Sequence, residues 1–289
     1  MHRVLFGVKS VSVREKHSRP WLSGIHSLAV ERTMHKMIKE IWARNEAAFG
    51  TMITSVRNPA IMLIMAEAGF DFAVLDCEHG SFSYETAEDM ILAGRTTGLV
   101  PIVRIPEVRR EPVLKYLEAG AQGILAPQIE ERAQVEELVE YAFYAPRGKR
   151  GVSLMRPHTS FRRPHPQDYM AQANRRNLVI LQIESKRAIE NLDDLLSVPG
   201  VDAALIGPND LTQSLTDGRH DDPQAVREAI QAVAEAAARH GVVAGIHCSR
   251  LEDVIYWRDK GMRLCMWSSD VSMLMEQARA GLARLRSDT

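Results

Sequence analysis

Two carboxylates at the ends of successive apolar runs are the residues of this sequence best suited to chemistry. Glu184 follows the run 178–183, and Asp210 follows the run 203–206. If both runs are neighbouring parallel strands, about 4.8 Å apart, the two acids converge at the carboxyl edge of the sheet. Two carboxylates can bind Mg²⁺ or Mn²⁺ but leave most of its roughly six oxygen positions to water and substrate, which is the open arrangement that catalysis needs. The alternative is that both acids only cap the helices that follow.

A second candidate group follows another apolar run, in the segment Leu75-Asp76-Cys77-Glu78-His79. Alternation along a strand places Asp76 and Glu78 on one face and Cys77 on the other, so Cys77 is better suited to packing than to nucleophilic attack. His79 falls in the loop just beyond. A carboxylate beside a histidine can fix its tautomer and raise its basicity, so Asp76 and His79 form a candidate catalytic pair.

Arg104 and Gln182 add polar groups to the same expected edge. Arg104 lies in the otherwise apolar run 101–105, where a guanidinium needs a paired acid or a bound anion. Gln182 has the same strand parity as Glu184 and should lie beneath it on one face. Polar residues therefore reach one rim from four different strands.

The elements that position these residues alternate between short apolar strands and amphipathic helices. Eight such units predict a single-domain (β/α)8 TIM barrel over residues 34–289, with its active site at the carboxyl ends of the strands. The expected strands are 49–54, 72–78, 100–105, 123–128, 178–184, 203–206, 242–247 and 264–267, and the expected helices are about 58–68, 84–96, 111–119, 131–143, 188–197, 223–240, 251–260 and 271–285.

Residues 1–33 do not fit this pattern. They are basic, lack sustained periodicity and lack the apolar core of a secretory signal. We interpret them as a flexible N-terminal extension, with Met34 as the natural beginning of the barrel domain. The alternative is a basic surface arm.

Composition excludes several classes of protein. With 45% hydrophobic and 25% charged residues the chain is a normal globular protein, and it has no apolar run long enough for a membrane span. The net charge of -1 argues against nucleic acid as a partner. Cys77, Cys248 and Cys265 are few and widely spaced, which favours a reducing, cytoplasmic location and no thiolate metal cluster.

One long connection, between the expected helix 131–143 and the expected strand 178–184, interrupts the pattern. A loop of this length is usually functional or disordered. We expect a lid that attracts an anionic substrate, and the alternative is a solvated basic loop. Its basic residues are Arg147, Lys149, Arg150, Arg156, His158, Arg162, Arg163 and His165.

Other chemistries fit less well. No lysine lies within an expected strand, which argues against a Schiff-base aldolase. The sequence also lacks a G-x-S-x-G elbow, a P-loop and a G-x-G-x-x-G after a strand, which weakens hydrolase, nucleotide-hydrolysing and dinucleotide-binding interpretations.

Six short motifs occur along the chain; they are, in order, GFDFAVLDCEHG, PIVRIP, EAGAQGILAP, RGVS, QIES and GVDAALIGPNDL. Together they resemble those of the HpcH/HpaI family of class II, metal-dependent pyruvate aldolases. The resemblance implies a (β/α)8 barrel that acts on a 2-oxo acid with a divalent cation, Mg²⁺ or Mn²⁺, with Co²⁺ as a further candidate. It further implies a homo-oligomer, often a hexamer built as a trimer of dimers, with the C-terminal helix exchanged between protomers.

The resemblance also implies roles for individual residues. The 2-oxo acid would chelate the cation, and cleavage of a 4-hydroxy-2-oxo acid would give pyruvate and an aldehyde. In this sequence Glu184 and Asp210 match the metal ligands, His79 and Asp76 the catalytic dyad, Arg104 the substrate-binding arginine and Gln182 a substrate-proximal glutamine, while N–H groups near Gly207 and Asn209 would hold the substrate carboxylate.

Departures from the family pattern bear on the second-substrate region. Asn209 stands where a small residue is common, EHG is followed by residues 81–84, and the last strand lacks a glycine-rich run. Some relatives condense oxaloacetate with an acyl thioester, so a condensing enzyme is the alternative activity. A non-catalytic metabolite-binding barrel is a third possibility, against which His79 beside a complete metal pair argues.

Overall fold

The computed structural model describes residues 37–287. The described residues belong to one compact unit and form a single domain. The extension predicted over residues 1–33 lies outside the described residues. None of the helices between residues 37 and 287 has the length and apolar character that a membrane crossing requires.

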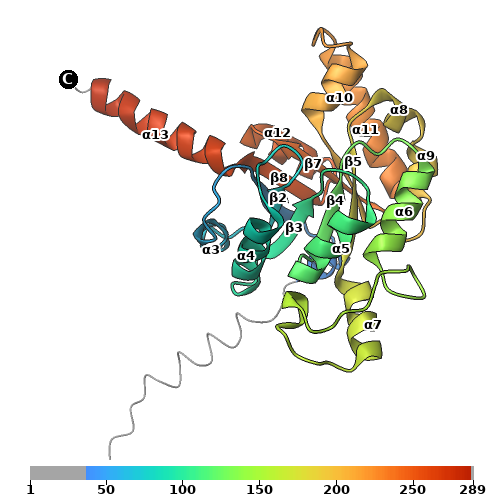
Figure 1. Ribbon diagram of the computed structural model, residues 1–289. Helices are drawn as coiled ribbons and strands as arrows, with labels where there is room; N and C mark the ends of the chain where they lie inside the picture. The colour runs from blue at the N-terminus through green and yellow to red at the C-terminus, as the bar shows by residue number, and fades with distance from the viewer. Residues whose placement is uncertain (1–36, 288–289) are drawn as a thin grey trace, which may run out of the picture. The chain divides into compact units, whose positions relative to one another are not determined.

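Eight parallel strands close into a barrel in the order of the sequence, with β8 pairing to β1, so the predicted (β/α)8 barrel is confirmed (Figure 1). Each expected strand is present within a few residues. The strands are β1 (Ala48–Ile53), β2 (Phe72–Asp76), β3 (Val100–Arg104), β4 (Gly123–Ala126), β5 (Leu178–Ile183), β6 (Ala203–Ile206), β7 (Val243–Cys248) and β8 (Leu264–Ser269).

Several helical features differ from the expectation: α2 precedes β1, and the long connection before β5 contains η1 and α7. The helix expected over 188–197 is divided at Asn191 into two short helices, and an additional helix, α10, begins at Pro208 directly after β6. The helices are α2 (Ile38–Ala43), α3 (Ala60–Glu67), α4 (Tyr84–Arg95), α5 (Arg110–Ala119), α6 (Arg132–Ala142), α7 (Pro166–Arg176), α8 (Lys186–Glu190), α9 (Leu192–Leu196), α10 (Pro208–Leu215), α11 (Pro223–His240), α12 (Leu251–Asp259) and α13 (Asp270–Ser287), with a 3₁₀ turn η1 (Pro157–Thr159).

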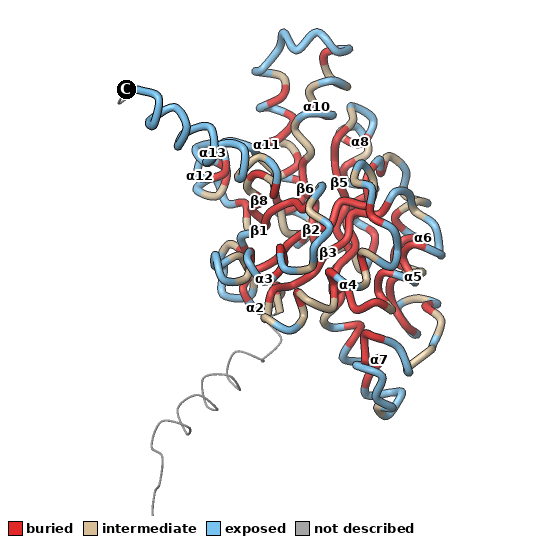
Figure 2. The backbone as a smooth tube through the Cα atoms, turned by 60° about the vertical axis from the view of Figure 1, so that its left-hand side comes forward, coloured by how far each residue is buried: buried red, intermediate tan, exposed pale blue. Residues whose placement is uncertain are grey.

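Strand alternation divides the core into two layers. One parity packs between the barrel and its helices, and the other fills the lumen. Figure 2 shows that the strands are buried. Along β5, Leu178 and Ile180 belong to the apolar lumen layer, and Gln182 and Glu184 continue the same parity above it. The site residues therefore stand on a packed apolar base.

The long basic connection is not a lid. It links α6 to the start of β5, so it lies at the amino end of the strands, and Figure 1 shows α7 at the opposite end of the barrel from α10. Arg95, the last residue of α4, anchors it by donating to the carbonyls of Pro157 and His158 at 2.6 and 3.1 Å. The lid prediction is wrong because a helix-to-strand connection returns to the amino end, away from the expected active site.

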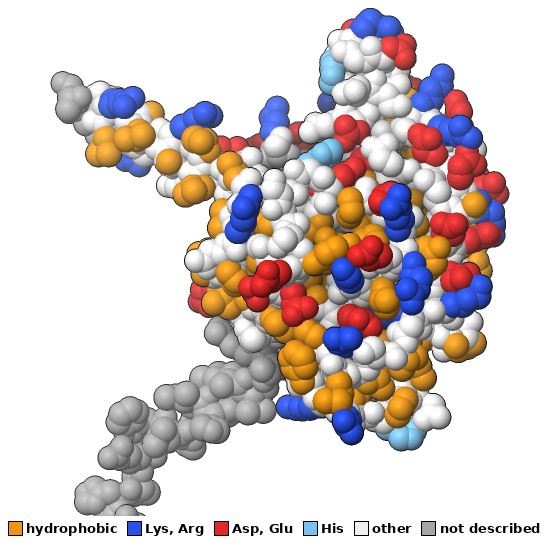
Figure 3. Space-filling view, in the orientation of Figure 1, with side chains coloured by type: hydrophobic (Ala, Val, Ile, Leu, Met, Phe, Trp, Pro, Cys, Tyr) orange, Lys and Arg blue, Asp and Glu red, His pale blue; other side chains and the backbone are white. Residues whose placement is uncertain are grey.

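The last helix leaves one side of the barrel uncovered. Helix α13 projects from the end of β8 and exposes apolar side chains along its length (Figures 1 and 3). Beside β1, β8 and α12 lies an apolar groove of about 390 Å³, lined by Phe49, Phe70, Leu251, Ile255 and Trp267 among others. Both apolar surfaces lack a partner within the described chain.

Candidate active site

A cavity of about 590 Å³ opens at the carboxyl ends of the strands. It is lined by seven of the sequence-predicted residues, Asp76, His79, Arg104, Gln182, Gly207, Asn209 and Asp210. Glu184 lies just outside it, in an adjoining hollow of about 540 Å³, and Asp210 borders both spaces. The tertiary structure thus gathers residues from β2, β3, β5 and α10 at one site.

Arg104 is paired with Asp76, as a buried guanidinium requires. Its Nε donates to Asp76 Oδ1 at 2.9 Å and its Nη2 lies 2.7 Å from Oδ2. The parallel register of β2 and β3 sets these two residues side by side. Burial alone would raise the pKa of Asp76, but the hydrogen bonds and charge of Arg104 hold this pKa below its usual range.

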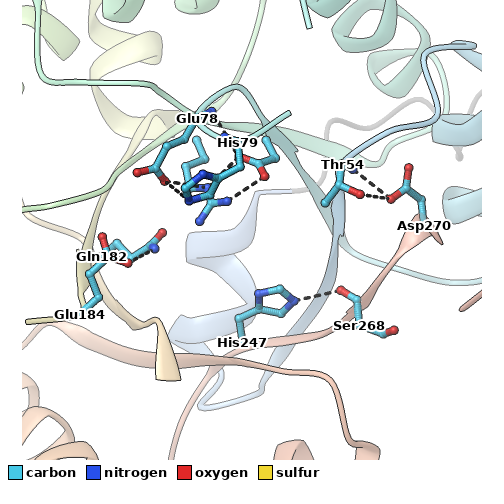
Figure 4. Close-up of polar contacts among 10 residues, drawn as sticks. Thr54, Glu78, His79, Gln182, Glu184, His247, Ser268 and Asp270 are labelled. Carbon is cyan, nitrogen blue, oxygen red and sulfur yellow. Dashed lines mark hydrogen bonds and ion pairs between the residues drawn. The ribbon is translucent and has the colours of Figure 1, made fainter. Parts of the chain in front are cut away.

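Asp76 holds the backbone of His79 rather than its ring. Asp76 Oδ1 accepts from the backbone N–H groups of Glu78 and His79 at 3.2 and 3.1 Å. The imidazole is 67% exposed, and its Nε2 lies 3.7 Å from Glu78 Oε2 (Figure 4). The expected side-chain contact between Asp76 and His79 is therefore replaced by one between Glu78 and His79.

Glu78 is a site residue that sequence reasoning did not select. Its Oε2 lies 3.3 Å from Arg104 Nε, and burial raises the pKa of Glu78 against the opposing charge of Arg104. The signal was available, because strand parity already placed Glu78 on the face of Asp76. The structure makes Glu78 the link between Arg104 and His79.

Glu184 is 3% exposed and is fixed from two sides. Its Oε1 accepts from the backbone N–H of Gln128 at 2.8 Å, and its Oε2 accepts from Gln182 Nε2. A Cβ at position 207 would stand 2.9 Å from Glu184 Oε2, so only Gly207 allows this close approach. Burial raises the pKa of Glu184, and the charge of Asp210 adds to the rise.

Asp210 belongs to the first turn of α10, whose amino end meets the cavity. The N–H of Gly207 donates to the carbonyl of Ile183 at 3.3 Å, and Pro208 has no N–H. The first-turn N–H groups of Asn209 and Asp210 are the ones left for a ligand. A helix amino end with free N–H groups favours an anion such as a carboxylate.

The residues present fit a divalent cation. Glu184 and Asp210 supply hard oxygen donors, and their mutual repulsion is what a cation would relieve. Within residues 37–287 no group of three or more His, Cys, Asp and Glu side chains forms a metal cluster. A cation held here would therefore take most of its ligands from water and substrate.

The opposite wall of the cavity was not predicted. His247 of β7 lines it, and His247 Nε2 lies 2.9 Å from the carbonyl oxygen of Ser268 of β8 (Figure 4). His247 ends an expected strand and lies on the same face of it as Gly245. Gly245 faces the lumen beside Leu205, so strand alternation could have placed His247 at the lumen rim.

Comparison with known proteins gives consistent results. The sequence matches the family described as HpcH/HpaI aldolase/citrate lyase over residues 51–276. A 5-keto-4-deoxy-D-glucarate aldolase of Escherichia coli is 32% identical over 195 residues, which is 67% of this chain and 75% of that protein.

Solved structures agree with that match. An HpcH/HpaI aldolase from Desulfitobacterium hafniense DCB-2 has a TM-score of 0.82 and 31% identity, covering 87% of this chain and 97% of that one. Citrate synthase SbnG has a TM-score of 0.79 and 27% identity, covering 87% and 98%. Macrophomate synthase has a TM-score of 0.75 and 25% identity, covering 88% and 89%. The chain belongs to the HpcH/HpaI aldolase/citrate lyase family, a family of carbon–carbon lyases, and is an enzyme of that class.

Proposed function

We propose that this enzyme is a divalent-metal-dependent aldolase that cleaves a 4-hydroxy-2-oxo acid to pyruvate and an aldehyde. The observation that carries the proposal is the arrangement around Asp210. Asp210 borders both the hollow that contains Glu184 and the cavity that contains Gln182 and Arg104. The free N–H groups of α10 lie at the same place. A 2-oxo acid has one carboxylate and one keto oxygen, which this arrangement can bind together.

The residues have distinct tasks in this proposal. Glu184 and Asp210 would hold Mg²⁺, Mn²⁺ or Co²⁺, which supplies Lewis-acid polarisation of the keto group. As the C3–C4 bond breaks, its electron pair stays on C3 and negative charge grows on the keto oxygen, where Arg104 donates hydrogen bonds. His79, beside the half-buried carboxylate of Glu78, is the group that would take the C4 hydroxyl proton and return a proton to C3.

A second candidate activity is a condensation in which an acyl thioester loses an α-proton and its enolate carbon attacks the keto carbon of a 2-oxo acid. The structural likeness to citrate synthase SbnG, at 27% identity, favours it. Oxaloacetate would then occupy the 2-oxo acid site. The two activities differ in whether product formation needs a thioester.

Pyruvate in deuterated water tests enolate formation at the 2-oxo acid site. Metal-stripped enzyme should exchange the pyruvate methyl protons only after Mg²⁺ or Mn²⁺ is added, and the metal-loaded enzyme should cleave a 4-hydroxy-2-oxo acid without thioester. Exchange without cleavage, together with thioester-dependent product, would support the condensing enzyme. Absence of exchange under all metal conditions would remove the proposed function.

We further infer that α13 is exchanged between protomers of a homo-oligomer, such as a hexamer built as a trimer of dimers. In a (β/α)8 barrel each strand is followed by a helix that covers it. Here α13 projects away from β8, and the apolar groove beside β1, β8 and α12 stays open. An α13 from a second copy would bury both apolar surfaces. Leu274→Glu should dissociate the oligomer in sedimentation, and Gln277→Glu, which adds the same charge to α13, should not. Equal sedimentation of both variants would contradict the exchange.

A further inference from the structure

The part of the cavity farthest along the barrel from Glu184 has no task in the proposed chemistry. It is formed by the ends of β1, β7 and β8 and by the first turn of α13, and hydroxyl groups dominate it. We call this surface the hydroxyl wall, defined as Thr54, Ser249, Ser268, Ser269 and Ser272. Because the 2-oxo acid half of the substrate is placed by Arg104 and α10, the other half must extend along another side of the cavity.

His247 lies at the centre of this region, and one of its ring nitrogens already makes a hydrogen bond within the protein. The carbonyl of Ser268 can only accept, so at 2.9 Å His247 Nε2 donates its proton to it. The same carbonyl also accepts from Thr51 Oγ1 at 3.3 Å, which fixes its direction. With the proton on Nε2, Nδ1 of the neutral ring is an acceptor, and no described residue donates to it.

The neutral form of His247 is favoured by its surroundings. Burial lowers the pKa of His247, and the charge of Arg104 lowers it further, while the bond to Ser268 and the charge of Asp76 oppose the shift. Nδ1 can therefore accept a hydrogen bond from an O–H group of a ligand near neutral pH. It is poorly suited to binding a carboxylate.

Ser268 holds this arrangement in an uncommon backbone conformation. It has φ of 56°, is 2% exposed, and its Oγ has no hydrogen-bond partner in the protein. A non-glycine residue in the left-handed region and a buried hydroxyl without a partner are both unfavourable. Such a combination beside a cavity indicates a place where a ligand completes the hydrogen bonding.

The charges around the hydroxyl wall disfavour a substrate that carries a second acidic group. Of the described residues that line the cavity, none is lysine, and Arg104, the one arginine, is held by Asp76 and Glu78. Asp253 adds a negative charge, and the neighbouring Arg250 lies 3.7 Å from Glu252 and 3.9 Å from Asp253.

Two other groups do not change the charge around the hydroxyl wall. Burial raises the pKa of Cys248 to about 12, so its thiol stays neutral. The basic segment that contains Arg162 and Arg163 belongs to the connection into the amino end of β5, and neither residue lines the cavity.

We propose that the hydroxyl wall and His247 bind the aldehyde half of the substrate and select an uncharged, hydroxylated aldehyde. His247 Nδ1 accepts a hydrogen bond from a hydroxyl of that half, and Ser249 and Ser268 are the wall residues whose hydroxyls no other side chain binds. This inference rests on the proposed aldolase function and adds the substrate class. It makes His247 a specificity-determining residue.

The first test uses the unmodified, metal-loaded enzyme in the condensation direction. Pyruvate is combined with glyceraldehyde, with butanal, or with succinic semialdehyde, which are hydroxylated, apolar and acidic aldehydes of similar size. We expect kcat/KM for glyceraldehyde to exceed both others by at least about 10-fold, because a site built to bind a hydroxyl rejects analogues without it. An equal or better kcat/KM for butanal or for succinic semialdehyde would overturn the inference.

The second test uses His247→Leu, with His165→Leu as the matched control. His165 is exposed and precedes α7, and it does not line the cavity. We expect His247→Leu to lower the ratio of kcat/KM between glyceraldehyde and butanal by at least about fivefold, chiefly through KM for glyceraldehyde. His247→Gln, which can still donate to Ser268 and accept a hydrogen bond, should restore part of the ratio.

Equal losses for both aldehydes in His247→Leu would overturn the inference, because a merely structural role affects both alike. Pyruvate methyl exchange separates this failure from that of the proposed function. If the unmodified enzyme shows no exchange, the aldolase proposal has failed. If exchange occurs but no aldehyde preference is found, only the selection by the hydroxyl wall has failed.

Discussion

Arg104 and Asp76 form a two-point ion pair across β3 and β2, with Nε and Nη2 at 2.9 and 2.7 Å from the two carboxylate oxygens. The pair fixes one edge of the planar guanidinium. The rest of the group lines the cavity and is available to a substrate. A lysine in the same place could not make this two-point contact and keep directed donors for the substrate.

Arg104→Lys should therefore lower kcat by about 10²-fold or more, the scale for loss of one oxyanion donor. Affinity for Mn²⁺ should persist because the metal ligands are elsewhere. Pyruvate methyl exchange and metal titration on the variant measure the two effects, and Arg109→Lys, at an exposed position, is the control. Near-normal exchange would leave Arg104 a structural ion-pair residue.

Removal of the cation should abolish turnover, because Glu184 and Asp210 are the acids of the proposed metal site. Glu184→Gln keeps the shape of the side chain but removes its charge. We expect it to weaken Mn²⁺ binding by at least about 10-fold, since loss of an outer-shell partner alone has that effect. Titration calorimetry measures the affinity, with Glu228→Gln on the exposed side of α11 as the control. Full activity in chelator after exhaustive dialysis would exclude the metal.

Neutralising the basic connection should not affect substrate capture. Arg162 and Arg163 are exposed in the segment that anchors on Arg95 at the end of α4. The double substitution to glutamine should leave KM for a 4-hydroxy-2-oxo acid within about twofold, because charges distant from the cavity and exposed to salt are largely screened. A severalfold rise in KM would restore the lid hypothesis.

Asp270 should make folding stability depend on pH. Its carboxylate accepts from the N–H groups of Thr54, Ser55 and Val56 at 2.9, 3.1 and 2.8 Å and from Thr54 Oγ1 at 2.8 Å. Burial alone would raise the pKa of Asp270, but these bonds lower it. A lowered pKa in the folded state stabilises the protein above the unfolded value of about 3.9, and this contribution is lost as the pH falls through the folded pKa.

Asp270→Asn should accordingly reduce the free energy of unfolding by about 2 kcal/mol at pH 7, with a smaller difference below about pH 4. Urea unfolding at both pH values measures it. The exposed Asp89→Asn is the control for loss of one negative charge. A difference that is the same at both pH values would show that ionisation of Asp270 contributes nothing.

A chain that begins at Met34 should retain turnover within about twofold, because every proposed site residue lies in the barrel. Steady-state kinetics with thermal unfolding as the folding check measures this. If the shortened chain folds but its turnover collapses, residues 1–33 contribute to the site or to assembly.

The sequence alone determined the barrel and much of its rim. Regular alternation of apolar runs with amphipathic helices is a local property, and strand parity follows from the backbone, so the order of residues along each strand suffices to assign Arg104, Gln182 and Glu184 to one face. The carboxyl ends of parallel strands necessarily meet. That explains why Asp76, Arg104, Gln182 and Asp210 were expected together and line one cavity.

Only the tertiary structure decided which side chains pair. From the sequence, the Asp76 side chain could pair with His79 or with Arg104. The register of β2 against β3 places it beside Arg104, and Glu78 is the acid whose side chain lies near the His79 ring. The bond from His247 to Ser268 depends on the turn of the backbone at Ser268. The pairs Asp76–Arg104 and His247–Ser268 join residues more than twenty positions apart, and the packing of neighbouring strands fixes their distances, so local propensity carries no information about them.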